Sequence, residues 1–203
     1  MILYGAPNPA PNPRRVRIFI AEKGLDLSET LVNMMKREHK SDEHRARNSL
    51  GQIPTLVLDD GTAISETVAI CRYLDDTNPG GALFGTTPLE RAHVDMWIRR
   101  VEFVLMNPVG MFWRHAHPRT AALLTQFKDF GESNRANYEG SLKWLDRELA
   151  EKPFIAGETY TMADICALCT IDFADWIGLP VGDDFPNVQA WHARVTARPS
   201  AQA

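Results

Sequence analysis

The chain has 203 residues, 44% of them apolar and 24% charged, which is typical of a globular protein and excludes a disordered or fibrous one. With 26 acidic and 22 basic side chains the net charge is −4, so no cationic field is available to bind nucleic acid. No apolar run reaches the about 18 residues of a membrane helix, and no basic leader precedes the first apolar residues, so we expect neither a membrane partner nor a secretory signal.

Strand and helix signals alternate in the N-terminal part. A short strand is predicted over residues 2–4, and the proline-rich segment 7–13 follows as a loop. Apolar residues at helical spacing then mark a helix that ends at Gly24, a residue type favoured just beyond a helix. Asn12 is predicted to cap this helix, with Pro13 as its first residue.

A second strand is predicted over residues 29–34. Residues 55–58 and 62–64 form a predicted β-hairpin, because the turn between them contains aspartate and glycine. Ser65 is placed to cap the next helix, whose buried face is predicted to carry Val68, Cys71 and Leu74. The order β-α-β, then β-β-α, predicts a small α/β sandwich.

A linker is predicted between residues 77 and 88, where two prolines and two adjacent glycines exclude a regular element. The chain is therefore expected to form one domain over residues 1–78 and another over residues 88–203. Only helical periods follow the linker, so the second domain is predicted to be all-α.

Helices are predicted in this domain over residues 88–107, 119–149 and 185–198, with a further one starting at Thr161. Pro108 is expected to break or kink the first of them. Thr161 and Asp164 have the spacing of a capping box, in which each side chain pairs with a backbone N–H of the other.

The histidines and cysteines give no strong sign of a metal or redox site. His115 and His117 are two residues apart, which puts them on different faces of a helix, so no metal is expected. Cys166 and Cys169 have CxxC spacing but lie inside an apolar helix, where core packing is the simpler interpretation. With Cys71 they are expected to be reduced thiols of a cytoplasmic protein.

A different chemistry is predicted around Ile53-Pro54 and Ser65-Glu66. An Ile-Pro bond before a strand is a candidate cis peptide, which would turn the backbone of Ile53 toward an extended peptide. The helix N-terminus at Ser65 favours a carboxylate, and Glu66 favours an ammonium group beside it. Together they could bind the α-end of an amino acid. Equally, Ile53-Pro54 could simply close a hairpin and Ser65 simply cap a helix, and the residues alone leave both interpretations open.

The sequence resembles bacterial cytosolic glutathione transferases over nearly its whole length. Five stretches carry the resemblance in the expected order: residues 15–24, 35–39, 48–56, 65–74 and 156–165. The resemblance implies a thioredoxin-like domain, an all-helical C-terminal domain and a homodimer.

The resemblance also implies a binding site for glutathione. Ile53 before Pro54 would pair with the cysteinyl backbone, and Glu66 and Thr67 would hold the γ-glutamyl end. His39 and Gln52 would lie near the glycyl end, as their counterparts do in theta-like members. A solvated loop histidine is the alternative role of His39.

The sequence departs from the family where the catalytic side chain is usually found. Ala10 aligns with the catalytic serine of theta-like and zeta-like members and has no donor, and no cysteine lies in the loop. Tyr4 lies one residue out of register with the catalytic tyrosine of other members, so alternation predicts that it points into the core.

Asn12 is then the best-placed group to stabilise a thiolate. Lowering a thiol pKa by about two units requires about 2.7 kcal/mol. An exposed helix N-terminus supplies only about 0.3–1 kcal/mol, whereas a hydrogen bond to the anion adds about 1.5–3 kcal/mol. The loop resembles nu-like members, in which an asparagine faces the sulfur, and one amide can cap a helix with its oxygen while its NH₂ points outward.

The sequence therefore predicts a glutathione transferase whose thiolate attacks an electrophilic carbon or reduces a disulfide or peroxide. The alternative is a glutathione-binding or ligand-carrier protein with little catalysis, which Ala10 favours. A small apolar electrophile would bind against the helical domain, where an aromatic and methionine-rich stretch contains Phe103, Met106, Met111, Phe112 and Trp113. These residues could equally pack the bundle.

Overall fold

The computed structural model describes residues 1–203, which form two compact units. The first unit comprises Met1–Ala82 together with Pro199–Ala203, and the second comprises Leu83–Arg198. The chain therefore passes between the units twice. Its last five residues, predicted to be part of the C-terminal domain, belong to the first unit.

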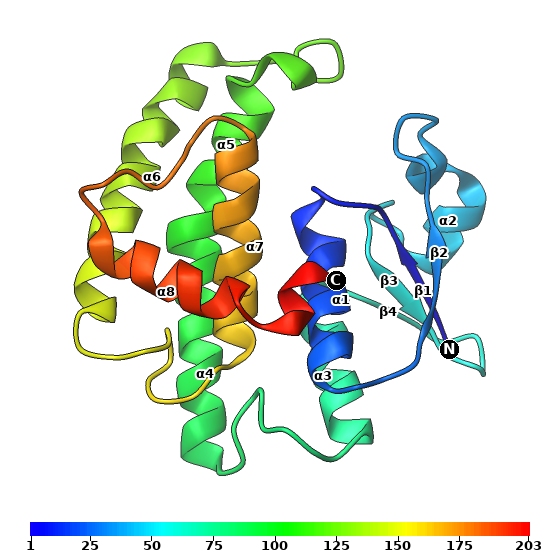
Figure 1. Ribbon diagram of the computed structural model, residues 1–203. Coiled ribbons are helices and arrows are strands. Elements are labelled where there is room, and N and C mark those ends of the chain that lie inside the picture. The colour runs from blue at the N-terminus through cyan, green and yellow to red at the C-terminus, as the bar shows by residue number, and fades with distance from the viewer. The chain divides into compact units, whose positions relative to one another are not determined.

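A four-stranded mixed sheet forms the centre of the first unit (Figure 1). Its order is β2-β1-β3-β4, with β1 parallel to β2 and antiparallel to β3, and β3 antiparallel to β4. Helices α1 and α3 lie on one side of it and α2 on the other. The elements are β1 Ile2–Gly5, α1 Pro11–Glu22, β2 Ser28–Leu31, η1 Glu38–Lys40, α2 Asp42–Arg47, β3 Thr55–Val57, β4 Ala63–Ser65 and α3 Thr67–Thr77.

The predicted hairpin is confirmed, while the second strand is shorter than predicted. In the hairpin, Leu58 N donates to the carbonyl of Thr62 across the turn. Strand β2 ends at Leu31 because the backbone N–H of Asn33 donates to the Glu38 carboxylate at 2.7 Å. That bond starts a turn which sequence periodicity could not show.

Helix α1 starts two residues earlier than predicted. Ala10 is its N-cap, Pro11 its first residue and Asn12 its second, and no side chain caps it. The capping role predicted for Asn12 is therefore wrong, and so is the placement of Pro13 as first residue. Both prolines fit the first turn, since neither needs an N–H partner there. The end at Gly24 is confirmed, with φ +62° and N–H bonds that close a Schellman motif.

Helix α3 also starts differently. Ser65 is paired with Thr55 in the sheet, so it does not cap the helix, and Glu66 is the N-cap. The buried face consists of Thr67, Ile70, Cys71 and Leu74, whereas Val68 is half-buried.

The five C-terminal residues are held against α1. The 3₁₀-helix η4 (Pro199–Gln202) contacts this helix, and Arg14 donates to the carbonyl of Ala201 at 2.9 Å. The Ser200 hydroxyl is hydrogen-bonded to Glu22, and Ser200 and Ala201 are buried. These contacts explain why the segment belongs to the first unit.

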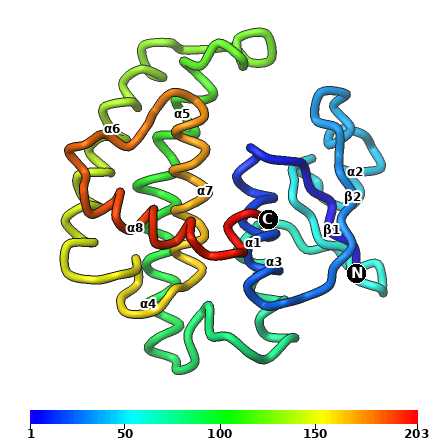
Figure 2. The backbone as a smooth tube through the Cα atoms, viewed as in Figure 1, coloured from blue at the N-terminus to red at the C-terminus, as the bar shows by residue number.

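The second unit is all-helical, as predicted (Figure 2). Its elements are α4 Pro88–Arg100, the π-helix η2 Val101–Met106, α5 Asn107–His115, η3 Pro118–Thr120, α6 Lys128–Leu149, α7 Met162–Trp176 and α8 Pro186–Thr196. Helix α7 is buried on nearly every face. Cys166 and Cys169 are buried in α7 and unbridged, as core packing requires. No helix combines the length and the apolar character that crossing a bilayer requires.

The helix predicted over residues 119–149 begins only at Lys128. Before it, the Thr120 hydroxyl donates to the Trp113 carbonyl at 2.7 Å, at the end of α5. The Gln126 amide donates to the His117 carbonyl at 2.9 Å. These bonds satisfy carbonyls at and just beyond the C-terminal end of α5 and hold residues 121–127 as a loop.

Pro108 does not break the helical path, contrary to the prediction. The preceding π-helix widens the turn, and Asn107 N donates to the carbonyl of Glu102, five residues back. Pro108 cannot donate to the Val104 carbonyl, and the Ser141 hydroxyl of α6 donates to it instead at 2.6 Å.

Replacing Ser141 with alanine is expected to destabilise the protein by about 1 kcal/mol, because the partly buried Val104 carbonyl would lose the hydroxyl that donates to it. Urea unfolding measures the change. Ser133→Ala is the control, since Ser133 is exposed and bonds only within α6. Equal stability of the two variants would contradict this role of Ser141.

Two capping boxes start helices in this unit, and Thr161–Asp164 is the predicted one. In the other, Glu90 accepts from the Thr86 hydroxyl at 2.6 Å and from the backbone N–H groups of Thr86 and Thr87. These bonds lower the pKa of Glu90 from 4.5 to about 2.

Because the folded-state pKa of Glu90 is lowered, its stabilising effect should be complete above pH 4.5 and lost as the pH falls toward about 2. The stability difference between the wild type and Glu90→Gln, measured by urea unfolding, should therefore shrink as the pH is lowered through this range. A difference independent of pH would rule the mechanism out.

Candidate functional site

The segment predicted to bind a peptide is held by side chains of α2 and its own loop. The carbonyl of Gln52 accepts from His44 Nε2 at 2.8 Å and from Asn48 Nδ2 at 3.0 Å. The following Ile53–Pro54 bond is cis, as predicted. Pro54 is buried, Ile53 is half-buried and the Gln52 side chain is exposed. This loop therefore has a fixed backbone conformation directly before β3.

Gly51 brings the loop close to His39. Lys40 Nζ donates to the carbonyls of Leu50 at 3.0 Å and Gly51 at 2.7 Å. A Cβ atom on Gly51 would lie 2.7 Å from the carbonyl oxygen of His39, and its φ is +57°, so only glycine fits. His39 in η1 and Gln52 in the following loop, both predicted to lie near the glycyl end, are thus on segments that the Lys40 bonds join.

His39 is half-buried, and its Nδ1 atom is buried without a hydrogen-bond partner. Burial lowers the pKa of His39, and the positive charges of Lys40, His44 and Arg37 lower it further. The ring is thus near cationic groups that would attract an anion.

Sheet register puts Glu66 at the same end of the sheet as Pro54. Ser65, the last residue of β4, pairs with Thr55, the first residue of β3. Glu66, which follows β4, and Pro54, which precedes β3, therefore lie at the same end of the sheet. Glu66 is exposed and has φ +69°, a left-handed conformation that is rare outside glycine. Thr67 begins α3, where free N–H groups and the helix dipole favour an anion.

The loop after β1 leads from this same end of the sheet to the N-terminus of α1. Pro11 and Pro13 carry no N–H, and Ala10 N donates to the Pro7 carbonyl at 3.3 Å. Asn12 therefore supplies the only backbone N–H among residues 11–13, in the first turn of α1. Its side chain, half-buried, does not cap the helix.

Tyr4 differs from the prediction that it points into the core. It is half-buried on the α2 side of the sheet, with its ring edge-on to His44 and the Arg47 guanidinium 4.3 Å from the ring centre. Ala10, at the aligned serine position, is half-buried.

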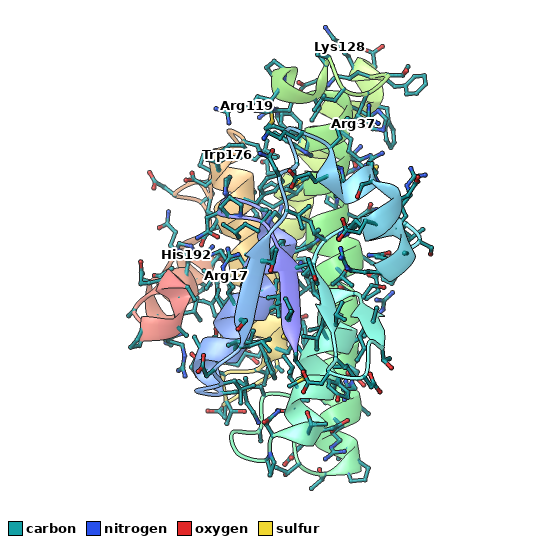
Figure 3. All side chains as sticks on the ribbon, turned by 90° about the vertical axis from the view of Figure 1, so that its right-hand side faces the viewer. Arg17, Arg37, Arg119, Lys128, Trp176 and His192 are labelled. Atoms are coloured by element: carbon teal, nitrogen blue, oxygen red, sulfur yellow. The ribbon has the colours of Figure 1, made fainter.

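Arg17 is a residue of this region that sequence reasoning missed. The position of Arg17 is labelled in Figure 3. Its guanidinium donates to the Ala6 carbonyl, to the Asn8 side chain and to Glu29. The sequence does indicate that this loop needs an outside donor, because its prolines leave many carbonyl acceptors and few N–H donors. Only the fold shows that Arg17 is the side chain that supplies the donors.

In the second unit, the residues of the stretch predicted to bind an electrophile differ in burial and in their contacts. Phe112 is buried and Phe103 exposed, whereas Trp113 joins an aromatic cluster with Phe173 and Trp176 at centroid distances of 5.4 and 5.6 Å. The Arg119 guanidinium lies 4.5 Å from the Trp176 ring centre (Figure 3). The cluster offers large, partly exposed aromatic faces.

Comparison with known proteins agrees with this arrangement. The model of the glutathione S-transferase N-terminal domain matches residues 10–77, and that of the C-terminal domain matches residues 115–199. Glutathione S-transferase 2 of Saccharomyces cerevisiae is 37% identical over 206 residues, which cover all of this chain and 88% of the relative.

Solved structures agree as well. Gtt2 from Saccharomyces cerevisiae superposes with a TM-score of 0.92 at 36% identity, covering 100% of this chain and 99% of that one. A glutathione S-transferase domain-containing protein of Marinobacter aquaeolei has the same TM-score at 37% identity, with 98% and 99% covered. Both matches extend over the thioredoxin-like and the helical parts, and we conclude that the chain belongs to the glutathione S-transferase family.

Proposed function

We propose that this chain binds glutathione at the end of the N-terminal sheet where β1, β3 and β4 meet the loops, and that it stabilises the glutathione thiolate there. One observation supports the proposal above all. Sheet register and loop hydrogen bonds bring four separate segments to the same end of the sheet: the loop at His39, the loop at Gln52–Pro54, the turn at Glu66–Thr67 and the start of α1.

Each segment supplies a chemistry that one part of glutathione needs. The backbone of Ile53, before Pro54, would pair with the cysteinyl residue as a neighbouring strand does. Glu66 would pair with the γ-glutamyl ammonium group, and Thr67 at the start of α3 would bind the carboxylate beside it. His39 and Gln52 would hold the glycyl end, where nearby cations attract its carboxylate.

The thiolate would be stabilised at the N-terminus of α1 by Asn12. A helix N-terminus alone supplies too little energy for a two-unit change in pKa, so a donor is required. Asn12 lies in the first turn of α1, and its side chain is not occupied by capping, so its NH₂ would be available as that donor. Its backbone N–H adds a second donor on the same residue.

The chemical step would need positioning and thiolate stabilisation but no covalent enzyme intermediate. In conjugation, the sulfur forms a bond to an electrophilic carbon and the leaving group departs with its electron pair. With a disulfide, the sulfur would instead attack one sulfur and release the other as a thiolate. Residues 1–78 would supply glutathione binding and residues 88–203 the apolar electrophile site, in a cytoplasmic homodimer.

Calorimetric titration with glutathione, followed by chromogenic aryl-halide and disulfide-reduction assays, tests this function. Binding with turnover in either assay is expected. Binding without turnover would favour a glutathione-binding or ligand-carrier protein, the role that the donorless Ala10 supports. The absence of binding heat would remove both functions.

A further inference from the structure

We propose that Arg17 is a positioning residue of the thiolate site: it fixes the proline-rich loop before α1, and with it the place of Asn12. The inference rests on the proposed function and assigns Arg17 a role through the loop that it holds, by its bonds to Ala6, Asn8 and Glu29.

The loop from Ala6 to Ala10 is poor in hydrogen-bond donors. Pro7 and Pro9 have no N–H, and the only backbone bond within the loop is the one from Ala10 N to the Pro7 carbonyl at 3.3 Å. Pro7, Asn8 and Pro9 are exposed. Neither the sheet nor packing therefore holds Pro7, Asn8 and Pro9, and an external donor is needed to fix them.

Arg17 supplies those donors from within α1. Its Nη1 donates to the Ala6 carbonyl at 2.8 Å, and its Nη2 donates to Oδ1 of Asn8. A guanidinium has five N–H groups in a planar fork and accepts nothing, so it matches a loop that offers only acceptors. The two bonds reach both the start and the middle of the loop.

The guanidinium is itself held from the neighbouring strand. Nη1 of Arg17 also donates to Oε1 of Glu29 in β2 at 3.2 Å, and the two side chains are only 17% and 23% exposed. A Cβ atom on Gly5 would lie 2.2 Å from this Glu29 oxygen, so the carboxylate fills space that only glycine leaves open. Strand β2, the end of β1, the loop and α1 are thereby joined through one side chain.

Fixing the loop matters because it leads directly into the first turn of α1, where Asn12 lies. We call the two Arg17 bonds to Ala6 and Asn8 the clamp. Losing the clamp would let the loop and this first turn shift relative to the end of the sheet that carries Pro54 and Glu66. A displacement of about 1 Å at a reacting group is enough to reduce a rate by up to about a hundredfold. Glutathione binding by the other segments should change much less.

The test compares Arg17→Met and Asn8→Ala with the wild type. The readouts are the thiolate difference absorbance of bound glutathione against pH, kcat with an aryl halide, and the calorimetric Kd for glutathione. For Arg17→Met we expect the bound thiol pKa to rise by about one unit and kcat to fall about tenfold, with Kd changed by less than about threefold. Asn8→Ala should act in the same direction more weakly, and the double variant should be no worse than Arg17→Met, because both remove one clamp.

Arg135→Met is the control, since it removes an exposed arginine–glutamate pair with Glu132 in the second unit and should leave the bound thiol pKa unchanged. If folded Arg17→Met binds glutathione with the wild-type thiol pKa and kcat, the inference is wrong while the proposed function stands. If the wild type itself binds no glutathione, the proposed function fails and the inference with it. If Arg17→Met does not fold, Asn8→Ala decides: a raised thiol pKa supports the clamp, and an unchanged one overturns it.

Discussion

Asn12→Ala is expected to raise the pKa of the bound glutathione thiol and to reduce turnover at least about tenfold. A neutral hydrogen-bond donor to an anion is worth about 1.5–3 kcal/mol, which corresponds to about one to two pKa units. The helix dipole and the backbone N–H of residue 12 persist in the variant, so part of the stabilisation should remain. Titration of the thiolate absorbance of the complex measures the change directly.

Asn12→Ser is the matched variant, because serine keeps a donor at the same position and should restore part of the lost stabilisation. No capping bond is lost in either variant, since Asn12 is the second residue of α1 and caps nothing. Melting temperatures should therefore stay close to that of the wild type. An unchanged thiolate titration in Asn12→Ala would rule out the side chain as the donor and leave its backbone N–H as the remaining group of this residue.

Features set by neighbouring residues were predictable from the sequence. The hairpin follows from its turn residues, the end of α1 from Gly24, and the start of α7 from Thr161 and Asp164. The family resemblance led to the correct two-part fold. Local chemistry leaves some choices open, however, as at the start of α1, where Pro11 and Pro13 both suit a first turn.

Features that depend on distant partners were not predictable. Pro108 looks like a helix breaker until Ser141, from another helix, is seen to satisfy the Val104 carbonyl. Ser65 looks like a helix cap until its sheet pairing with Thr55 is known. The same holds for the candidate site. Its peptide-binding motif was visible in the sequence, whereas the clamp formed by Arg17 depends on the strand that brings Glu29 to it.

The largest effect on stability is expected from Asp164 in α7. This carboxylate is fully buried and accepts four hydrogen bonds, from Ile155 N and Trp191 Nε1 on Oδ1 and from the backbone and hydroxyl of Thr161 on Oδ2. It therefore joins the start of α7 to the preceding loop and to α8. Burial raises the pKa of Asp164, while the hydrogen bonds from Ile155, Trp191 and Thr161 oppose that rise.

Asp164→Ala should destabilise the protein by about 3–5 kcal/mol, because it leaves several buried donors without an acceptor. Asp164→Asn should be nearly as damaging although it has the same shape, since either orientation of the amide points its NH₂ at groups that themselves donate. Denaturant unfolding of both variants measures the loss, and Glu90→Gln, at the same position of the exposed capping box, is the control with a much smaller effect. A wild-type midpoint in Asp164→Asn would mean that shape alone, not the four accepted bonds, holds these segments together.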